Sequence, residues 1–154
     1  MELTLDQALQ KGVEAHKAGK AQEADQYYTA ILKANPKHPD ANHNMGVLAV
    51  GVGKIKEALP FFQTALEVNQ TIGQYWLSYI DALIKLNRMD DAQATLDQAR
   101  SKGAKGDGFQ KIEKQLIILE QTAAVTDANH LDPPKSRLND ILKLYKQGKL
   151  QKAL

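Results

Sequence analysis

The sequence predicts an all-α protein, an α-solenoid made of consecutive helix–turn–helix units. Two observations support this fold: a pattern of small and aromatic residues that returns every 34 residues, and apolar residues at helical spacing between the fixed positions. The pattern is clearest within 42–65, where it comprises Gly46, Gly53, Ala58, Phe62 and Ala65. The equivalent residues upstream and downstream are Gly12, Gly19, Ala24, Tyr28 and Ile31, and Ile80, Asn87, Ala92, Leu96 and Ala99. A generic bundle of amphipathic helices would show the helical spacing without this fixed register.

The small residues of the pattern set the distance between the two helices of a unit. Gly12 and Ala24 in the first copy, and Gly46 and Ala58 in the second, place little side chain at the helix crossing. The backbones can therefore approach more closely than the usual separation of about 8–10 Å. The third copy has Ile80 at the first of these positions, so we expect its two helices to lie further apart.

The ends of the helices are predicted by capping and turn residues. Thr4 with Gln7 has the capping-box spacing at the start of the first helix. Gly19, Gly53 and Asn87 tolerate the left-handed backbone that ends a helix, and each closes a first helix. The first predicted helix ends at about residue 18. The next five span about 21–34, 40–52, 55–68, 73–86 and 89–102.

The chain after the third copy is predicted to contain a cap and a linker. Three glycines within 101–108 indicate a loop. Apolar residues at helical spacing then predict a capping helix over 108–121 that packs on the third copy; they are Phe109, Ile112, Leu116 and Leu119. Residues 122–135 show no periodicity and contain Pro133 and Pro134, so they are predicted to be a linker.

The C-terminal segment, 136–154, is predicted to begin a further, truncated repeat. Its apolar stripe consists of Leu138, Ile141, Leu142 and Tyr145. An isolated amphipathic helix cannot bury such a stripe, so the end of its own solenoid, its own groove or a neighbouring molecule must cover it. We hypothesise the last of these, a concentration-dependent homodimer through the tail.

The register, with its small, aromatic and turn positions, resembles that of the tetratricopeptide repeat (TPR) family, of the type found in bacterial proteins. The resemblance covers about Leu5 to Gly103 and gives three copies, at 4–37, 38–71 and 72–104. It implies a right-handed superhelix of α–α pairs with a concave groove lined by the first helix of each copy. It also implies a non-catalytic scaffold for protein–protein interaction, whose apolar-centred groove binds a helical or extended peptide segment.

The family's groove positions can be carried over onto this sequence. They fall on Leu9, Val13, His16, Lys17, His43, Asn44, Val47, Val50, Leu77, Ser78, Asp81, Ile84 and Lys85. The alternative interpretation is that some of these valines and leucines simply pack between neighbouring first helices.

A well-known TPR subgroup binds the terminal carboxylate of chaperones through lysine, asparagine and arginine side chains. The matching positions here are Leu9, Val13, Asn44, Gln74 and Ser78, of which only Asn44 agrees. Without the cations the groove cannot offset the desolvation of a carboxylate. The sequence therefore predicts that this chain does not bind chaperone tails.

Composition argues against most other classes of function. The chain has no cysteine and no metal-binding spacing of histidines, phosphate loop or nucleophile motif, so we expect no enzyme activity, cofactor or metal. A net charge of +2 is too small to indicate nucleic-acid binding. No apolar run approaches the roughly 20 residues of a membrane span, and no signal peptide precedes the first helix, which favours a cytoplasmic location.

A second hypothesis also rests on resemblance. Bacterial proteins with repeats, a proline-marked break and a resumed repeat often continue into a glycosyltransferase, a sulfotransferase or a methyltransferase. The chain would then be the N-terminal, substrate-recruiting arm of a larger enzyme whose catalytic domain lies beyond residue 154. The sequence that follows Leu154 would distinguish the two hypotheses.

Overall fold

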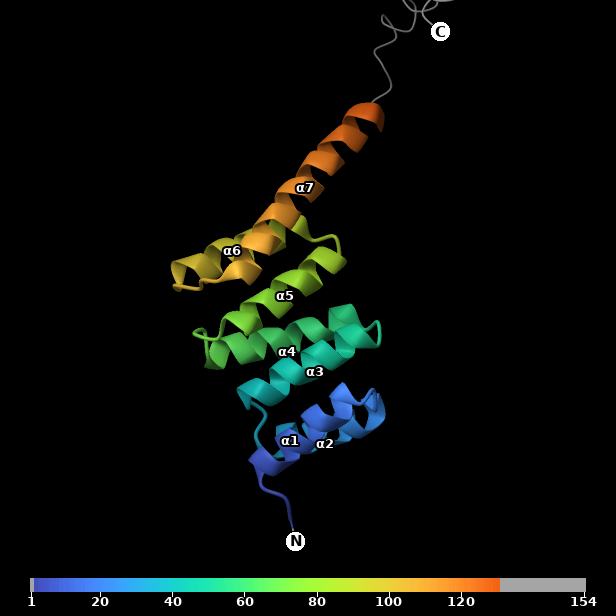
Figure 1. Cartoon of the computed structure of the whole chain (residues 1–154), viewed down its shortest axis with the longest axis vertical. Helices are drawn as coiled ribbons and strands as arrows, with labels where there is room; N and C mark the ends of the chain where they lie inside the picture. The colour runs from blue at the N-terminus through green and yellow to red at the C-terminus, as the bar shows by residue number, and fades with distance from the viewer. Residues whose placement is uncertain (1, 131–154) are drawn as a thin grey trace, which may run out of the picture. The chain divides into compact units, whose positions relative to one another are not determined.

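The computed structural model describes residues 2–130, and in that part of the chain it contains α-helices and no strand (Figure 1). This confirms the all-α prediction. The helices are α1 (Leu5–Lys17), α2 (Ala21–Ala34), α3 (Pro39–Gly51), α4 (Ile55–Val68), α5 (Gly73–Lys85), α6 (Met89–Ser101) and α7 (Asp107–His130). The first six agree with the predicted helices to within one or two residues.

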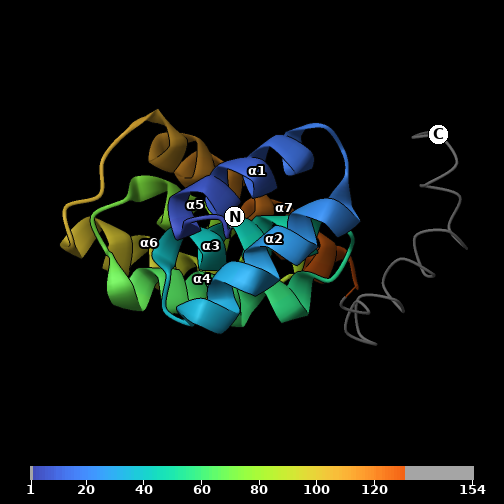
Figure 2. The same ribbon diagram turned by 90° about the horizontal axis from the view of Figure 1, so that it is seen from below.

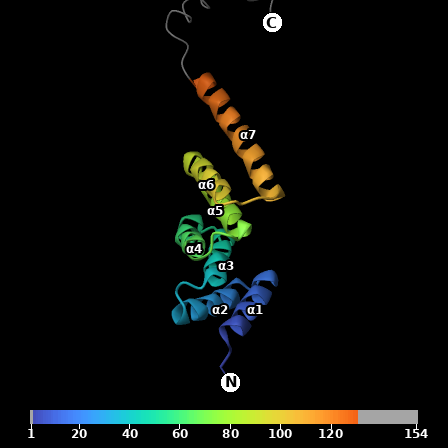
Figure 3. The same ribbon diagram turned by 90° about the vertical axis from the view of Figure 1, so that its left-hand side faces the viewer.

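The six helices pack as three successive pairs, α1 with α2, α3 with α4 and α5 with α6. The second helix of each pair also contacts the first helix of the next, and α3 contacts both α1 and α5. Seen from the side, α2, α4 and α6 follow one edge of the stack, while α1 and α3 follow the other (Figure 3). Seen from below, α1 and α5 lie towards one side and α4 towards the opposite side (Figure 2). The stacked pairs confirm the α-solenoid.

The residues predicted to start and end the helices do so in the structure. Thr4 forms a complete capping box: its hydroxyl accepts from the Gln7 backbone N–H at 3.1 Å, and the Gln7 side chain accepts from the Thr4 N–H at 3.0 Å. After the first helix of each pair, the backbone is left-handed at Gly19 (φ 76°), Gly53 (φ 83°) and Asn87 (φ 58°). Asparagine tolerates this conformation better than most side chains, which explains its place in the third copy.

The helix crossings show why the first two copies need glycine. A Cβ added to Gly12 would lie 2.6 Å from Cε1 of Tyr28, and one added to Gly46 would lie 2.6 Å from Cε1 of Phe62. Each glycine therefore leaves room for an aromatic ring from the second helix. The third copy holds a larger residue at the glycine position, Ile80, and a smaller one at the ring position, Leu96; both are fully buried. As predicted for this copy, α5 and α6 approach each other less closely than the helices of the other pairs.

The helix α7 begins in the register of a fourth first helix. The starts of α1, α3, α5 and α7 are Leu5, Pro39, Gly73 and Asp107, which are spaced by the repeat length. Phe109 and Leu116 of α7 are buried, and Leu77 of α5 lies so close to Gly108 that an added Cβ would be 2.6 Å from Cδ1 of Leu77. The first turns of α7 therefore cover the third copy, as a cap does.

A bidentate ion pair adds a second link between this cap and the third copy. The two Nη atoms of Arg100 on α6 donate to the two carboxylate oxygens of Glu113 on α7, at 2.9 and 2.7 Å. The hydrogen bonds lower the pKa of Glu113 and raise that of Arg100. Both side chains are more than 40% exposed, so the ion pair contributes little to the stability of the fold. Its main effect is to orient α7 relative to α6.

The predicted linker is wrong over its described part. Residues 122–130 are helical, because α7 continues from the cap to His130 without a break. The fourth copy has Gln121 where the other copies have Gly19, Gly53 and Asn87, so it lacks the turn residue. The chain divides into two compact units after Leu116, and α7 enters the second unit at Ile117. The rest of the predicted linker, 131–135, and the predicted truncated repeat, 136–154, lie outside the described residues, as does the tail stripe of Leu138, Ile141, Leu142 and Tyr145.

Candidate functional site

All the residues predicted to line the groove lie on α1, α3 and α5, and we call their shared surface the first-helix face. Most of them are half-buried, so each presents part of its side chain to solvent; these are Leu9, Val13, His16, Asn44, Val47, Val50, Leu77, Ser78 and Asp81. Lys17 and Lys85 are exposed. His43 and Ile84 are buried, with 9% and 8% of their surface accessible, and so contribute mainly to packing.

The apolar centre of the first-helix face comes from α3, with contributions from both neighbours. Val47 and Val50 lie one turn apart on α3; Val13 is the equivalent of Val47 on α1, and Leu77 on α5 is the equivalent of His43. Leu77 also packs against the start of α7, so part of its surface is used by the cap. The charged groups beside this centre neutralise each other in part, since Lys85 donates to Asp81 at 2.6 Å. The described side chains of this face thus include half-buried valines and a leucine beside one pair of compensated charges.

Polar side chains, of which His43 and Tyr75 are buried, join α3 to α5 beneath this face. The His43 ring stacks on the Tyr75 ring, with centroids 4.8 Å apart. Its Nε2 lies 2.8 Å from the Ser78 hydroxyl, and its Nδ1 lies 3.3 Å from the side-chain oxygen of Asn44. The Tyr75 hydroxyl donates to the carboxylate of Asp40. Asn44 and Ser78 are thus held in place by contacts that also fix the spacing of the second and third copies.

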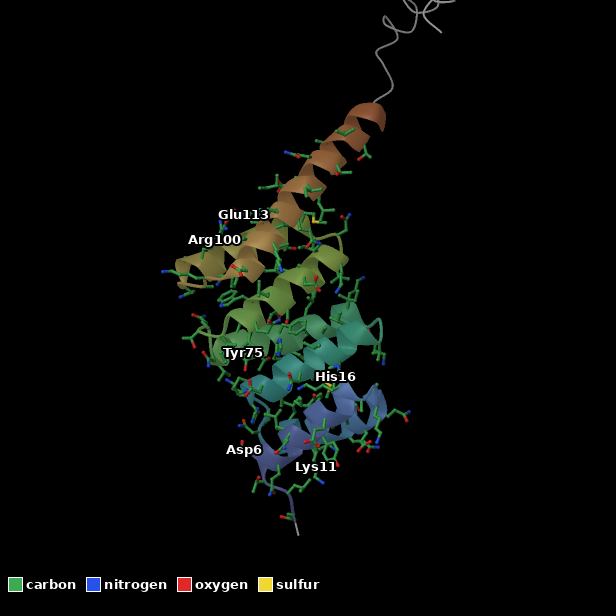
Figure 4. The ribbon with its side chains drawn as sticks, viewed as in Figure 1. Asp6, Lys11, His16, Tyr75, Arg100 and Glu113 are labelled. Atoms are coloured by element: carbon green, nitrogen blue, oxygen red, sulfur yellow. The ribbon has the colours of Figure 1, made fainter. Side chains whose placement is uncertain are left out.

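The sequence prediction did not single out Tyr75, which Figure 4 labels on α5. Both cross-copy contacts, from Asp40 to Tyr75 and from His43 to Ser78, join residues 35 positions apart. A search for complementary polar residues at the repeat length plus one could therefore have found them. The equivalent pairs between the first and second copies are Asp6 with Ala41 and Leu9 with Asn44, which cannot form the same bonds. The polar link is therefore a feature of the junction between the second and third copies, and the junction between the first and second copies lacks it.

Burial sets the ionisation of these groups. Desolvation lowers the pKa of His43, and the smaller opposing effects of Asn44 and Asp40 do not reverse this direction. Burial, followed by the hydrogen bond to Asp40, raises the pKa of Tyr75. At neutral pH the tyrosine remains a donor, and a neutral imidazole can accept from Ser78 through Nε2 and donate to Asn44 through Nδ1.

We expect stability to fall as the pH drops below about 6.5, the ordinary histidine pKa. The unfolded chain then binds a proton at His43 that the folded chain does not, which costs at most about 1.4 kcal/mol per pH unit until the lower, folded pKa is reached. Thermal melts at pH 7.5 and 5.5 measure the effect. On acidification, the melting temperature should fall further in the native chain and in a His16→Gln control than in His43→Gln. Equal losses in all three chains would contradict the assignment to His43.

His16 differs from His43 in its surroundings. Its Nδ1 lies 3.4 Å from the hydroxyl of Tyr28, and the two rings meet edge to face with centroids 6.2 Å apart. The contact joins the end of α1 to α2 within the first copy, where Figure 4 labels His16. His16 is half-buried, so part of the ring packs on Tyr28 and part is accessible to solvent.

Several open hollows lie on the described part of the molecule, and none of the predicted groove residues lines the following two. One, of about 990 Å³, is formed by α1, α2 and the N-terminal segment, with Leu5, Tyr27 and Ile31 among its lining. The other, of about 810 Å³, opens between α2 and α4 over α3 and includes Met45, Val52 and Phe61. Substitutions in these hollows can serve as controls for substitutions on the first-helix face.

Residues 2–130 contain no cluster of three or more histidine or acidic side chains placed to hold a metal ion. Within the same range, none of the helices combines the length and the apolar character that crossing a bilayer requires.

Comparison with known proteins fixes the family. A family model described as "Tetratricopeptide repeat" matches residues 15–78 and again 49–113, which together make up more than half of the chain. The chain belongs to the tetratricopeptide repeat family. The fold is that of a protein–protein interaction scaffold, and TPR domains of this kind are typically non-catalytic. No curated protein matches this TPR chain significantly.

Solved TPR structures resemble most of this chain. The TPR domain of Arabidopsis OM64 is 20% identical with a TM-score of 0.66, and the similarity covers 73% of this chain and 93% of that one. The TPR2B domain of yeast Sti1, in its complex with pHsp70, is 21% identical with a TM-score of 0.68, covering 77% and 97%. The first TPR of Spaghetti (RPAP3), bound to the HSP90 peptide SRMEEVD, is 20% identical with a TM-score of 0.64, covering 76% and 93%. At these identities the similarity establishes the TPR fold.

Proposed function

We propose that this TPR protein binds a peptide segment of a protein partner on its first-helix face. The half-buried apolar centre at Val13, Val47, Val50 and Leu77 carries the proposal, because apolar side chains at the middle of a surface contribute most to binding. The polar residues beside it, Asn44 and Ser78, are held by the buried contacts to His43 and can orient a bound segment.

The chemistry of the face favours an apolar, nearly neutral segment, helical or extended. Two of the structural neighbours are recorded in complexes with chaperones or chaperone peptides. In this chain the positions that would hold a terminal carboxylate are occupied by Leu9, Val13, Gln74 and Ser78, none of which is cationic. A carboxylate placed there would lose its water without gaining a charged partner. We therefore expect weak or no binding of peptides with acidic C-termini.

Replacing Val47 by glutamate tests the proposal. The charge would lie at the centre of the first-helix face, and its desolvation should weaken partner binding by about tenfold or more. Partners recovered with the intact chain would be identified by quantitative mass spectrometry, and affinities for peptides derived from them measured by fluorescence anisotropy.

Val52→Glu is the matched control, because Val52 is 53% exposed and lines the hollow between α2 and α4. The control should retain full affinity. Loss of binding in Val52→Glu with no change in Val47→Glu would place the binding surface between α2 and α4 and refute the proposal.

The hypothesis of an accessory arm predicts a different partner for the same face. The segment bound would then belong to the substrate of an attached enzyme, and a glycosyltransferase, sulfotransferase or methyltransferase domain would follow residue 154 in the complete protein. Reading the coding sequence beyond that position decides between an independent scaffold and an arm.

A further inference from the structure

The second half of α7 carries an apolar face that no described residue covers. Ile117, Ile118 and Val125 are 47%, 61% and 60% exposed. Ile118 and Val125 are two turns apart on one line of the helix, and Ile117 lies beside that line. In the three complete copies the first helix is covered by a second helix that returns after a tight turn. Up to residue 130, α7 has no such returning helix.

One substitution explains why no helix returns at the usual place. Gln121 replaces the turn residue, so α7 continues instead of reversing. Lys114 also replaces the glycine of Gly12 and Gly46, but the third copy has Ile80 there and still forms its returning helix, so the turn residue decides. A covering segment must therefore come from beyond the end of α7.

We propose that residues 136–154 fold back on the second half of α7 in the same chain and form an antiparallel helical hairpin. The occupant of the apolar face is then the stripe of Leu138, Ile141, Leu142 and Tyr145. Only residues 131–135 separate α7 from this segment, and two of the five are Pro133 and Pro134. Prolines interrupt helical hydrogen bonding, and a connection this short favours antiparallel neighbours.

The spacing of apolar residues on either side of the prolines is consistent with this pairing. Val125 precedes Pro133 by eight residues, and Leu142 follows Pro134 by eight. Because a helix rises about 1.5 Å per residue, these two residues reach equal heights in a hairpin.

Charge and tethering favour the same occupant. Residues 117–130 contain two acids, Glu120 and Asp127, and no lysine or arginine, whereas residues 135–154 contain six basic residues and one acid. The opposite net charges attract over the roughly 10 Å range of electrostatics in salt. A short tether also gives the segment an effective concentration in the millimolar range, above that of a second copy in most solutions. The continuation of α7 to His130 thus shortens the tether and favours the hairpin over the tail-mediated homodimer.

The absence of cysteine in the chain permits a direct test in the full-length protein. The double variant Val125→Cys with Leu142→Cys would be oxidised at low concentration and examined by non-reducing electrophoresis and intact mass. The matched control pairs Ala123→Cys with Leu142→Cys, because Ala123 lies on the opposite side of α7 at nearly the same height. We expect the first pair to form a disulfide within one chain at least about tenfold faster than the control, since a disulfide requires Cα atoms within about 7 Å.

The other outcomes would overturn the proposal. Disulfide-linked dimers that increase with protein concentration would show that a second copy covers the face. Equal rates for the two pairs would show that the segment does not settle on this side of α7. Hydrogen exchange provides a readout without cysteines: amides of 117–126 should exchange faster in Ile141→Lys with Leu142→Lys than in the native chain, and unchanged exchange would also contradict the hairpin.

Discussion

Replacing Phe62 by alanine is expected to destabilise the protein by about 3–5 kcal/mol, the typical cost of removing a buried aromatic ring. The ring is 1% exposed and packs directly on the backbone of Gly46. Its centroid also lies 5.8 Å from that of the His43 ring, which takes part in the polar link between copies. Its small neighbours, Gly46 and Ala58, have no side-chain length with which to fill the cavity.

Urea denaturation followed by circular dichroism measures the loss, with a check that the slope of free energy against urea stays constant. Phe61→Ala is the matched control, because the adjacent phenylalanine is half-buried and lines the hollow between α2 and α4. We expect the control to lose much less stability. A loss for Phe62→Ala no larger than that for Phe61→Ala would contradict the packing of α4 on α3 described here.

Replacing Ala58 by leucine should destabilise by about 1–3 kcal/mol through overpacking. Ala58 has no accessible surface and belongs to α4, which pairs with α3 through the Gly46 and Phe62 contact. A leucine at this position must push the two helices apart or displace the Phe62 ring. Both responses disturb the contact between the second and third copies, because the same ring adjoins His43.

Thermal melting of Ala58→Leu and of Ala94→Leu provides the comparison. Ala94 is an exposed helical residue of α6, where leucine is tolerated because alanine and leucine are both good helix formers. The control should melt within error of the native chain. An unchanged melting temperature for Ala58→Leu would mean that α3 and α4 can separate at little cost, which the glycine geometry argues against.

The sequence determined the solenoid, its register and six of its helices. Contacts in a solenoid join only neighbouring copies, so each copy must repeat the same crossing and turn residues, and these are visible in the sequence. The sequence alone therefore predicts the contact of Gly46 with Phe62 and the turn at Gly53. The start of α7 at Asp107 follows the same register, although the predicted cap was placed one residue later.

The end of α7 and the state of the candidate site were decided by tertiary structure. Residues 122–130 lack apolar periodicity, which indicated a linker, but they also lack glycine and proline; once the cap has nucleated α7, each further residue extends it at little cost. The first-helix face depends on how α3 packs against α5. This packing buries His43 beneath the Tyr75 ring and brings the Nε2 atom of His43 to the Ser78 hydroxyl, while Val47 and Val50 stay accessible. Helical spacing places all five residues on first helices, but burial depends on contacts between copies, which periodicity within one helix does not specify.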